Sequence, residues 1–196
     1  MKQVIGVTGG IASGKSNVLG VIKELGYPVI DCDSIAHRLA QKGESVYNRI
    51  IEVFGNDYLL EDGNLNRKKL GNLIFHDAAS KELLNQISHP LIHNEVVKEI
   101  NKIKDGLVFI DVPLLYESGF DSLCDKVICV YLDKKLQIER LMERDKIDMD
   151  YANSKISSQM DLNKKKDLAD YIIDSKGSFD ETKCQVLKIL EEIKGD

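Results

Sequence analysis

Five short hydrophobic runs, rich in valine and isoleucine, are spaced along the chain. They cover residues 4–8, 29–31, 107–112, 127–132 and 171–174. Compact runs of β-branched and aromatic residues favour strands, and amphipathic helical patterns separate these runs. Strands that alternate with helices indicate a parallel sheet, because parallel strands need crossover helices that then cover both faces. The pattern therefore predicts an α/β fold with a five-stranded parallel sheet flanked by helices.

The interval between the second and third strands is the longest, and apolar residues recur in it at helical spacing. Four apolar stripes are present, and they begin at Val46, Leu70, Leu84 and Val96. The third stripe is expected to end before Pro90, because proline removes a backbone hydrogen bond in a helix interior. We therefore predict a helical insertion over residues 34–105, within a core formed by residues 1–33 and 106–196.

The composition narrows the class of protein. With 196 residues, the chain is long enough for one substantial core, and it contains no apolar run long enough to cross a membrane. These observations favour a single-domain protein in the cytoplasm, and no feature indicates an obligate protein partner. The four cysteines form no C-x-x-C pair and have no histidine at metal spacing, which indicates reduced thiols.

The charge of the chain bears on its partners. A formal net charge of −5 argues against nucleic acid, because phosphate backbones bind clustered lysine and arginine. The only basic run covers residues 164–166. We interpret that run as the solvated end of a helix.

A glycine-rich segment joins the first strand to the first helix. Residues 9–16, GGIASGKS, match the pattern G-x-x-x-x-G-K-S/T. Glycines in this setting let backbone N–H groups surround phosphates, and the helix N-terminus adds partial positive charge. Lys15 would reach the terminal phosphates and Ser16 would bind Mg²⁺, so the segment predicts an ATP site. The predicted binding residues are Gly9, Gly10, Ile11, Ala12, Ser13, Gly14, Lys15, Ser16 and Asn17.

Two carboxylates follow predicted strands. Asp111 closes the third strand, where an acidic group can hold the magnesium shell. Asp33 comes directly after the second strand, and a carboxylate there can take the proton of an alcohol as a phosphate bond forms. The alternative for Asp33 is a helix N-cap, because a helical pattern begins after it. Spacing alone leaves both roles open, whereas Asp31 is assigned a structural role.

Arg140 and Arg144 lie four residues apart on one face of a helical pattern, which they share with Gln137. Two cations near a nucleotide suggest a lid that clamps negative charge. The alternative is a solvated face paired with neighbouring carboxylates, and the pattern alone favours it slightly. The four histidines all fall in the helical insertion without a third metal ligand. Among them, His89 could hold a substrate or cap a turn.

With these residues in place, the chain resembles the dephospho-CoA kinases. These enzymes use ATP to phosphorylate the ribose 3′-hydroxyl of dephospho-CoA in the last step of coenzyme A biosynthesis. The resemblance covers nearly the whole chain and implies a P-loop kinase fold with a helical acceptor-binding insertion and a helical lid over residues 134–160. It is carried by TGGI with GKS, VIDCD (29–33), HPLI (89–92), DVPLLYE (111–117), Gln137 with Arg140 and Arg144, Gln159, and AD with IID (169–174).

The resemblance also implies roles for individual residues. Asp33 is implied as the general base, while Lys15 and Ser16 would hold ATP and Mg²⁺. Arg140 is implied as a catalytic residue of the lid, with Arg144 beside it at the phosphates. The implied metal ligands are Ser16 and Asp111. The implied acceptor-binding residues are Asp33, His89, Pro113, Leu114, Leu115 and Glu117.

Three departures from the family pattern are visible. Ala12 and Asn17 replace the frequent Gly and Thr but leave the lysine and hydroxyl intact, whereas Ser175 replaces a frequent Asn and puts an adenine-side contact in question. The nearest alternative function is another small-molecule P-loop kinase that acts on a sugar or nucleoside hydroxyl. A GTP-hydrolysing switch is disfavoured, because the nearest match to N-K-x-D, at 101–104, ends in lysine. A non-catalytic ATP binder stays open.

Overall fold

The computed structural model describes residues 1–195 and contains a five-stranded sheet. The strands are β1 (Lys2–Gly9), β2 (Val29–Asp31), β3 (Gly106–Asp111), β4 (Lys126–Tyr131) and β5 (Tyr171–Asp174), in the spatial order β2-β3-β1-β4-β5. The pairs β1–β3, β1–β4 and β4–β5 are parallel, with Gly6 of β1 opposite Ile110 of β3 and Val127 of β4. The predicted α/β fold with a parallel sheet is confirmed.

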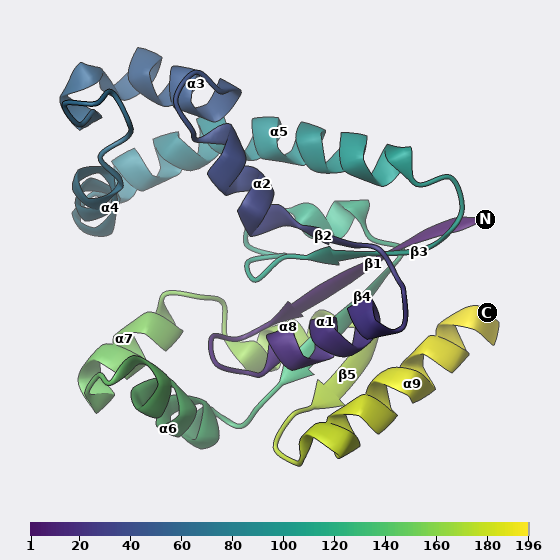
Figure 1. The fold of residues 1–196 in the computed structure, drawn as a ribbon. Helices are drawn as coiled ribbons and strands as arrows, with labels where there is room; N and C mark the ends of the chain where they lie inside the picture. The colour runs from purple at the N-terminus through teal and green to yellow at the C-terminus, as the bar shows by residue number, and fades with distance from the viewer. Residues whose placement is uncertain (196) are drawn as a thin grey trace. The chain divides into compact units, whose positions relative to one another are not determined.

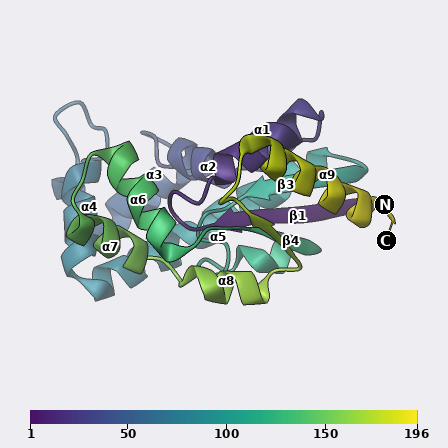
Figure 2. The same cartoon turned by 90° about the horizontal axis from the view of Figure 1, so that it is seen from below.

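Two helices that lie at opposite ends of the sequence cover one face of this sheet. Helices α1 (Lys15–Glu24) and α9 (Phe179–Gly195) pack against each other (Figure 1), and α8 (Leu162–Leu168) lies on the other side of β1 and β4 (Figure 2). Burial of each large apolar side chain between the layers contributes about 1.5–3 kcal/mol. The core beneath α1 and α9 includes Ile5, Val7, Val18, Ile22, Phe109, Ile128, Ile173, Val186 and Ile193.

The chain divides into two compact units. One comprises residues 1–30 and the segment from 103 onward, and the other comprises residues 31–102. The predicted insertion began at residue 34 and ended at 105, a few residues further along the chain. The second unit consists of α2 (Cys32–Leu39), α3 (Ser45–Phe54), the 3-10 helix η1 (Asn56–Tyr58), α4 (Arg67–His76) and α5 (Ala78–Lys102). Its helix α5 packs against α2, α3 and α4.

The prediction that a helix ends before Pro90 is wrong, because α5 continues through this residue. Pro90 removes the N–H that would donate to the carbonyl of Gln86. Both residues occupy exposed positions, where water can satisfy that carbonyl. Further along α5, Val96 and Ile100 are buried, and the helix packs against α2, α3 and α4. Packing along the whole helix therefore offsets the cost of about 3 kcal/mol for an interior proline.

Two further helices, α6 (Lys134–Asp145) and α7 (Met149–Ser157), follow β4 and pack against each other. They occupy the region predicted as a lid. The Asp145 carboxylate joins them, because it accepts from Arg144 Nε at 2.8 Å and from Lys155 Nζ at 2.9 Å. These two cations, Arg144 first, lower the pKa of Asp145 to about 2. The remaining short element is the 3-10 helix η2 (Phe120–Leu123).

The cysteines of the described residues are all free thiols. Burial raises the pKa of Cys124 and of Cys129 to about 12, so neither is a thiolate near neutral pH. No helix within residues 1–195 has the length and apolar character needed to span a bilayer.

Candidate active site

The glycine-rich segment adopts a tight loop between β1 and α1. Gly14 has φ 84° and Ala12 has φ 59°, both in the left-handed region, which costs a residue with a side chain about 1–2 kcal/mol. A Cβ atom at Gly9 would lie 2.8 Å from the Val130 carbonyl oxygen. The close approach of β1 and β4 at this point therefore requires glycine. In the described structure, no side chain caps the N-terminus of α1. Its free N–H groups and helix dipole therefore favour an anion there.

Two glutamine side chains hold the middle of this loop by its backbone. Gln137 of α6 is 2% exposed, and its Nε2 donates to the Ile11 carbonyl at 2.6 Å. Gln159 Oε1 accepts from the Ile11 N–H at 3.0 Å. Gly10 makes room for this arrangement, because a Cβ atom there would clash with the Gln137 amide. Gln137 is therefore hydrogen-bonded to the backbone of the loop. The helical spacing predicts that Gln137 shares a face with Arg140 and Arg144, but it does not predict this bond.

Lys15 and Asp111 form an ion pair at the carboxyl end of the sheet. Lys15 is the first residue of α1, and Asp111 is the last residue of β3, which pairs directly with β1. Their side chains are 16% and 17% exposed, so the pair is accessible from one side. The structure thus brings together two of the residues that the sequence analysis assigned to the phosphates and the metal.

The polar side chains of the loop differ in how accessible they are to solvent. Ser16 and Asn17 are exposed at the start of α1, whereas Ser13 is buried. The Ser13 hydroxyl is one of two buried side-chain oxygens without a hydrogen-bond partner among the described residues. Ser16 therefore offers an accessible hydroxyl beside Lys15, while Ser13 is placed inside the loop.

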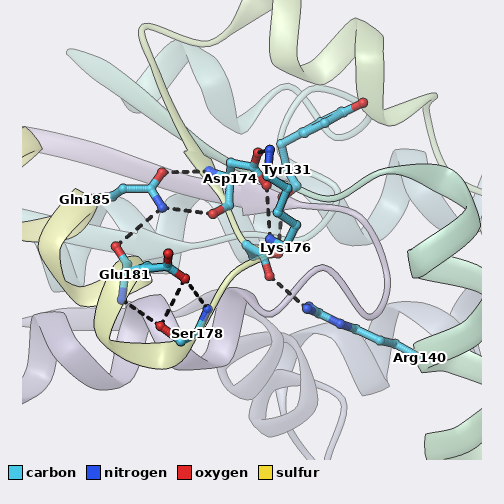
Figure 3. A network of polar contacts seen from close by, with 8 residues as sticks. Tyr131, Arg140, Asp174, Lys176, Ser178, Glu181 and Gln185 are labelled. Atoms are coloured by element: carbon cyan, nitrogen blue, oxygen red, sulfur yellow. Dashed lines mark hydrogen bonds and ion pairs between the residues drawn. The ribbon is translucent and has the colours of Figure 1, made fainter.

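Arg140 reaches from α6 toward the turn that follows β5 (Figure 3). Its Nη2 donates to the Ser175 carbonyl at 2.8 Å. The Ser175 hydroxyl donates to the Ser13 carbonyl at 2.6 Å and lies 3.1 Å from the Tyr131 carbonyl oxygen. Ser175 thus connects the lid, the glycine-rich loop and the end of β4. Ser175 stood out in the sequence only as a departure from a frequent Asn, and the bonds that it makes here are not predictable from that.

Two cavities open beside the loop. A cavity of about 270 Å³ is lined by residues 9–16 together with Pro113, Arg144 and Gln159. A second cavity of about 350 Å³ is lined by Ala12, Gly14, Ser16, Asn17, Arg140, Arg144, Ser175, Gly177, Phe179 and Thr182. Because the two cavities share Ala12, Gly14, Ser16 and Arg144, they adjoin each other around the N-terminus of α1. Together they provide room for a polyphosphate next to a larger organic group.

The helical unit carries Asp31, which is the last residue of β2, and Asp33, which lies two positions later. Asp31 is the N-cap of α2, because its carboxylate accepts from the Ser34 N–H at 2.8 Å and from the Ser34 hydroxyl at 2.8 Å. Asp33 lies in the first turn of α2 at an exposed position. The N-cap interpretation of Asp33 is therefore wrong, and its role as a base stays a prediction. His89 is half-buried in α5, and burial lowers its pKa.

The segment after β3 differs from what the resemblance implied. Leu114 is 43% exposed and can contact a ligand, but Leu115 has no exposed surface. The Leu115 side chain fills the space above Gly6, where a Cβ atom would lie 2.7 Å from Leu115 Cδ1. Glu117 Oε1 accepts from the Met160 N–H at 2.9 Å and pairs with Lys165 Nζ at 2.8 Å. A direct acceptor contact by Leu115 is therefore corrected to a structural contact, whereas the acceptor contact of Glu117, whose side chain is 23% exposed, stays a prediction.

The interpretation of residues 164–166 as a solvated helix end is wrong for its central residue. Lys165 has no exposed surface, and its Nζ donates to the Pro113 carbonyl at 2.7 Å. Lys164 is exposed, and Lys166 lies over the Tyr131 ring at 4.7 Å. The helical period alone could place Lys165 on the inner face of α8. Its partner Glu117, whose side chain is 23% exposed, lies 48 positions earlier and has no signal in the local sequence.

The sequence profile of the dephospho-CoA kinases matches residues 3–181. The chain belongs to the dephospho-CoA kinase family. A dephospho-CoA kinase of Enterococcus faecalis is 43% identical over 98% of both chains, and one of Bacillus cereus is 45% identical over 98% of both. A solved dephospho-CoA kinase of Campylobacter jejuni is 31% identical, covers 100% of this chain and 99% of its own, and has a TM-score of 0.73.

Membership of the dephospho-CoA kinase family confirms the resemblance inferred from the motifs and the P-loop kinase fold. It does not assign individual side chains. The placements of Lys15, Asp111 and Arg140 come from the geometry described above, whereas the proximity of Asp33 and His89 to the loop stays a prediction.

Proposed function

We propose that this member of the dephospho-CoA kinase family transfers the γ-phosphoryl group of ATP to the ribose 3′-hydroxyl of dephospho-CoA, giving CoA and ADP. The observation that carries the proposal is the Lys15–Asp111 pair beside the uncapped N-terminus of α1. A triphosphate fits this place, because backbone N–H groups, the helix dipole and Lys15 all favour negative charge. Phosphoryl transfer then depends mainly on positioning and charge stabilisation.

We assign the triphosphate to the cavity lined by residues 9–16 and the nucleoside to the adjoining larger cavity. Phe179 lines the larger cavity and is 46% exposed, so its ring can stack on a base. Arg140 and Arg144 line the same cavity from α6. Their guanidinium groups would clamp the phosphates and stabilise the charge that develops on the transferred group.

The donor set fits Mg²⁺. Magnesium prefers hard oxygen ligands and is usually held by one or two protein groups together with substrate phosphates. Ser16 offers an exposed hydroxyl and Asp111 a carboxylate at the same end of the sheet. Among residues 1–195 no group of three His, Cys, Asp or Glu side chains forms a metal cluster, which agrees with a metal held largely by phosphates. When bound, the ion would neutralise charge on the phosphates.

We assign the acceptor to the helical unit and to the segment after β3. Asp33 would accept the proton of the 3′-hydroxyl, since its carboxylate is exposed and the N-cap position belongs to Asp31. His89, Pro113 and Leu114 would contact the acceptor. The imidazole of His89 is kept neutral near pH 7 by burial, which lowers its pKa, so it can donate or accept one hydrogen bond.

An acceptor panel tests the proposal. ADP release is measured with Mg-ATP alone and after addition of dephospho-CoA, adenosine, pantetheine or shikimate. Turnover with dephospho-CoA alone among these acceptors is expected. Turnover with adenosine or shikimate and not with dephospho-CoA would support the alternative of another small-molecule kinase. ADP release that does not respond to any acceptor would contradict a kinase function.

A further inference from the structure

The most deeply buried charge in the sheet unit is a lysine that phosphoryl transfer does not use. Lys165 of α8 has no exposed surface, and it pairs with Glu117 Oε1 at 2.8 Å. A buried ammonium group is costly unless other groups pair with it and accept its hydrogen bonds. An apolar residue of similar volume could fill this place without that cost. Packing alone therefore does not explain why this position holds a lysine.

One contact of Lys165 fixes the chain directly after Asp111. Its Nζ donates to the Pro113 carbonyl at 2.7 Å, and the same oxygen accepts from the Thr8 hydroxyl at 3.2 Å. Thr8 belongs to β1, one residue before the glycine-rich loop begins. The Val112 N–H donates to the Val7 carbonyl at 3.1 Å. Lys165 thus completes a set of bonds that holds the two residues after Asp111 against β1.

The other contact of Lys165 leads to the glycine-rich loop from the side of the lid. Glu117 Oε1, its partner, also accepts from the Met160 N–H at 2.9 Å. The preceding residue is Gln159, whose side chain holds the Ile11 N–H at 3.0 Å. The ion pair between the buried Lys165 and the partly exposed Glu117 therefore connects the segment that carries Asp111 with the segment that carries Gln159.

We propose that Lys165, through its ion pair with Glu117, is a positioning residue for magnesium-dependent nucleotide binding. The inference rests on the proposed function only in taking the ligand to be Mg-ATP. Lys165 acts through Pro113 on Asp111 and through Glu117 on Gln159, and it touches neither the nucleotide nor the metal. Partners that orient a metal ligand typically change metal affinity by about 10–100-fold when they are removed.

The test compares Lys165→Met with the double variant Lys165→Met/Glu117→Gln. ATP binding is measured by calorimetry in EDTA and across a magnesium titration, together with thermal unfolding. In both variants the magnesium concentration at half-maximal enhancement of ATP binding should rise about tenfold. ATP affinity in EDTA should change less than about twofold. The double variant should unfold at a higher temperature than the single variant, because it leaves no unpaired carboxylate beside the introduced methionine.

The double variant separates positioning from stability. If its magnesium requirement returns to the wild-type value together with its stability, Lys165 serves stability alone and the proposal is overturned. Loss of ATP affinity by the same factor with and without magnesium would also overturn it. Ile193→Ala is the matched control, because it opens a cavity in the core under α9 and should lower the unfolding temperature without moving the magnesium requirement.

The outcome is independent of the acceptor. A wild-type protein that fails to phosphorylate dephospho-CoA would contradict the proposed function while leaving the binding comparison valid. A wild-type protein whose ATP binding ignores magnesium would overturn the role of Lys165 instead.

Discussion

At the scale of single residues, Asp31 at the end of β2 and Asp33 at the start of α2 have separable roles. Asp31 caps α2 through Ser34, and asparagine caps a helix about as well as aspartate. Asp33 is exposed in the first turn of the same helix. Asparagine at position 33 would keep the size of the side chain and remove the basic oxygen. The same chemical change at the two positions therefore distinguishes a base from a cap.

Asp33→Asn is expected to lower kcat by about 100-fold or more, the usual scale for loss of a general base. ATP affinity should be unchanged, because the residues that we propose for nucleotide binding belong to the other unit. The measurement is steady-state turnover of dephospho-CoA with calorimetric ATP binding. Asp31→Asn is the control and should retain near-wild-type kcat. Equal losses in both variants would argue against a special role for Asp33.

Lys15→Met is expected to weaken ATP binding by about 10–100-fold, since a hydrogen bond to a charged group contributes about 1.5–3 kcal/mol. It also leaves Asp111 without the cation that it contacts, so repulsion between that carboxylate and the phosphates adds to the loss. The control is Lys23→Met, an exposed lysine on the same helix. The ATP affinity of both variants is measured by calorimetry. If Lys15→Met binds ATP as tightly as the wild type, Lys15 does not bind the phosphates.

At the scale of secondary-structure elements, α6 links the nucleotide cavities to the loop. It carries Gln137, which bonds to Ile11, and Arg140, which bonds to the Ser175 carbonyl. At its end, the carboxylate of Asp145 binds Arg144 and Lys155. Because the pKa of Asp145 is lowered to about 2, its carboxylate at this junction with α7 is ionised near neutral pH. Movement of α6 would therefore displace Ile11 of the glycine-rich loop through its bond to Gln137.

The helix α5 provides a pH dependence of stability. Burial lowers the pKa of His89, and Glu82 opposes that shift only in part. The unfolded chain binds a proton at His89 near pH 6.5, whereas the folded chain does so only at lower pH. The contribution to stability is therefore present above pH 6.5 and is lost as the pH falls through the folded pKa.

His89→Gln should remove part of this dependence. The unfolding temperature is measured between pH 7.5 and 5 for the wild type and the variant. The wild type should lose more stability than the variant over this range, because only the wild type must charge a half-buried imidazole. A variant that loses as much as the wild type would show that His89 does not contribute.

At the scale of the whole molecule, local sequence patterns predicted the fold but did not predict the contacts between residues far apart in the sequence. The strand, loop and helix formed by residues 2–24 were predictable, because their apolar period and glycine motif lie within one short segment. The path of α5 through Pro90 was not, since it depends on three helices that pack against it. Burial of Lys165 depends equally on Glu117, which only the folded chain brings near.

The candidate site was predictable to a similar extent. The pattern placed Lys15 after the first strand and Asp111 at the end of the third, but that they meet because β1 and β3 are neighbours comes from the strand order of the structure. Leu115 was assigned to the acceptor because residue type cannot show on which side of a turn a side chain lies. Ser175 stood out only as a departure from the family pattern, and its bonds were not predictable because they reach carbonyl groups on two other segments.

The division into two units predicts where each ligand protects the backbone from hydrogen exchange. An ATP analogue with magnesium should slow exchange mainly in residues 9–17 and around 175–182, because the cavities are lined there. Dephospho-CoA should slow exchange mainly within residues 31–102. Mass spectrometry of peptides from each complex measures this, with Lys15→Met as the variant that should lose only the nucleotide pattern. Protection of residues 31–102 by the nucleotide alone, with none from dephospho-CoA, would contradict the assignment, since an acceptor bound to the helical unit must reduce the opening of that unit's own helices.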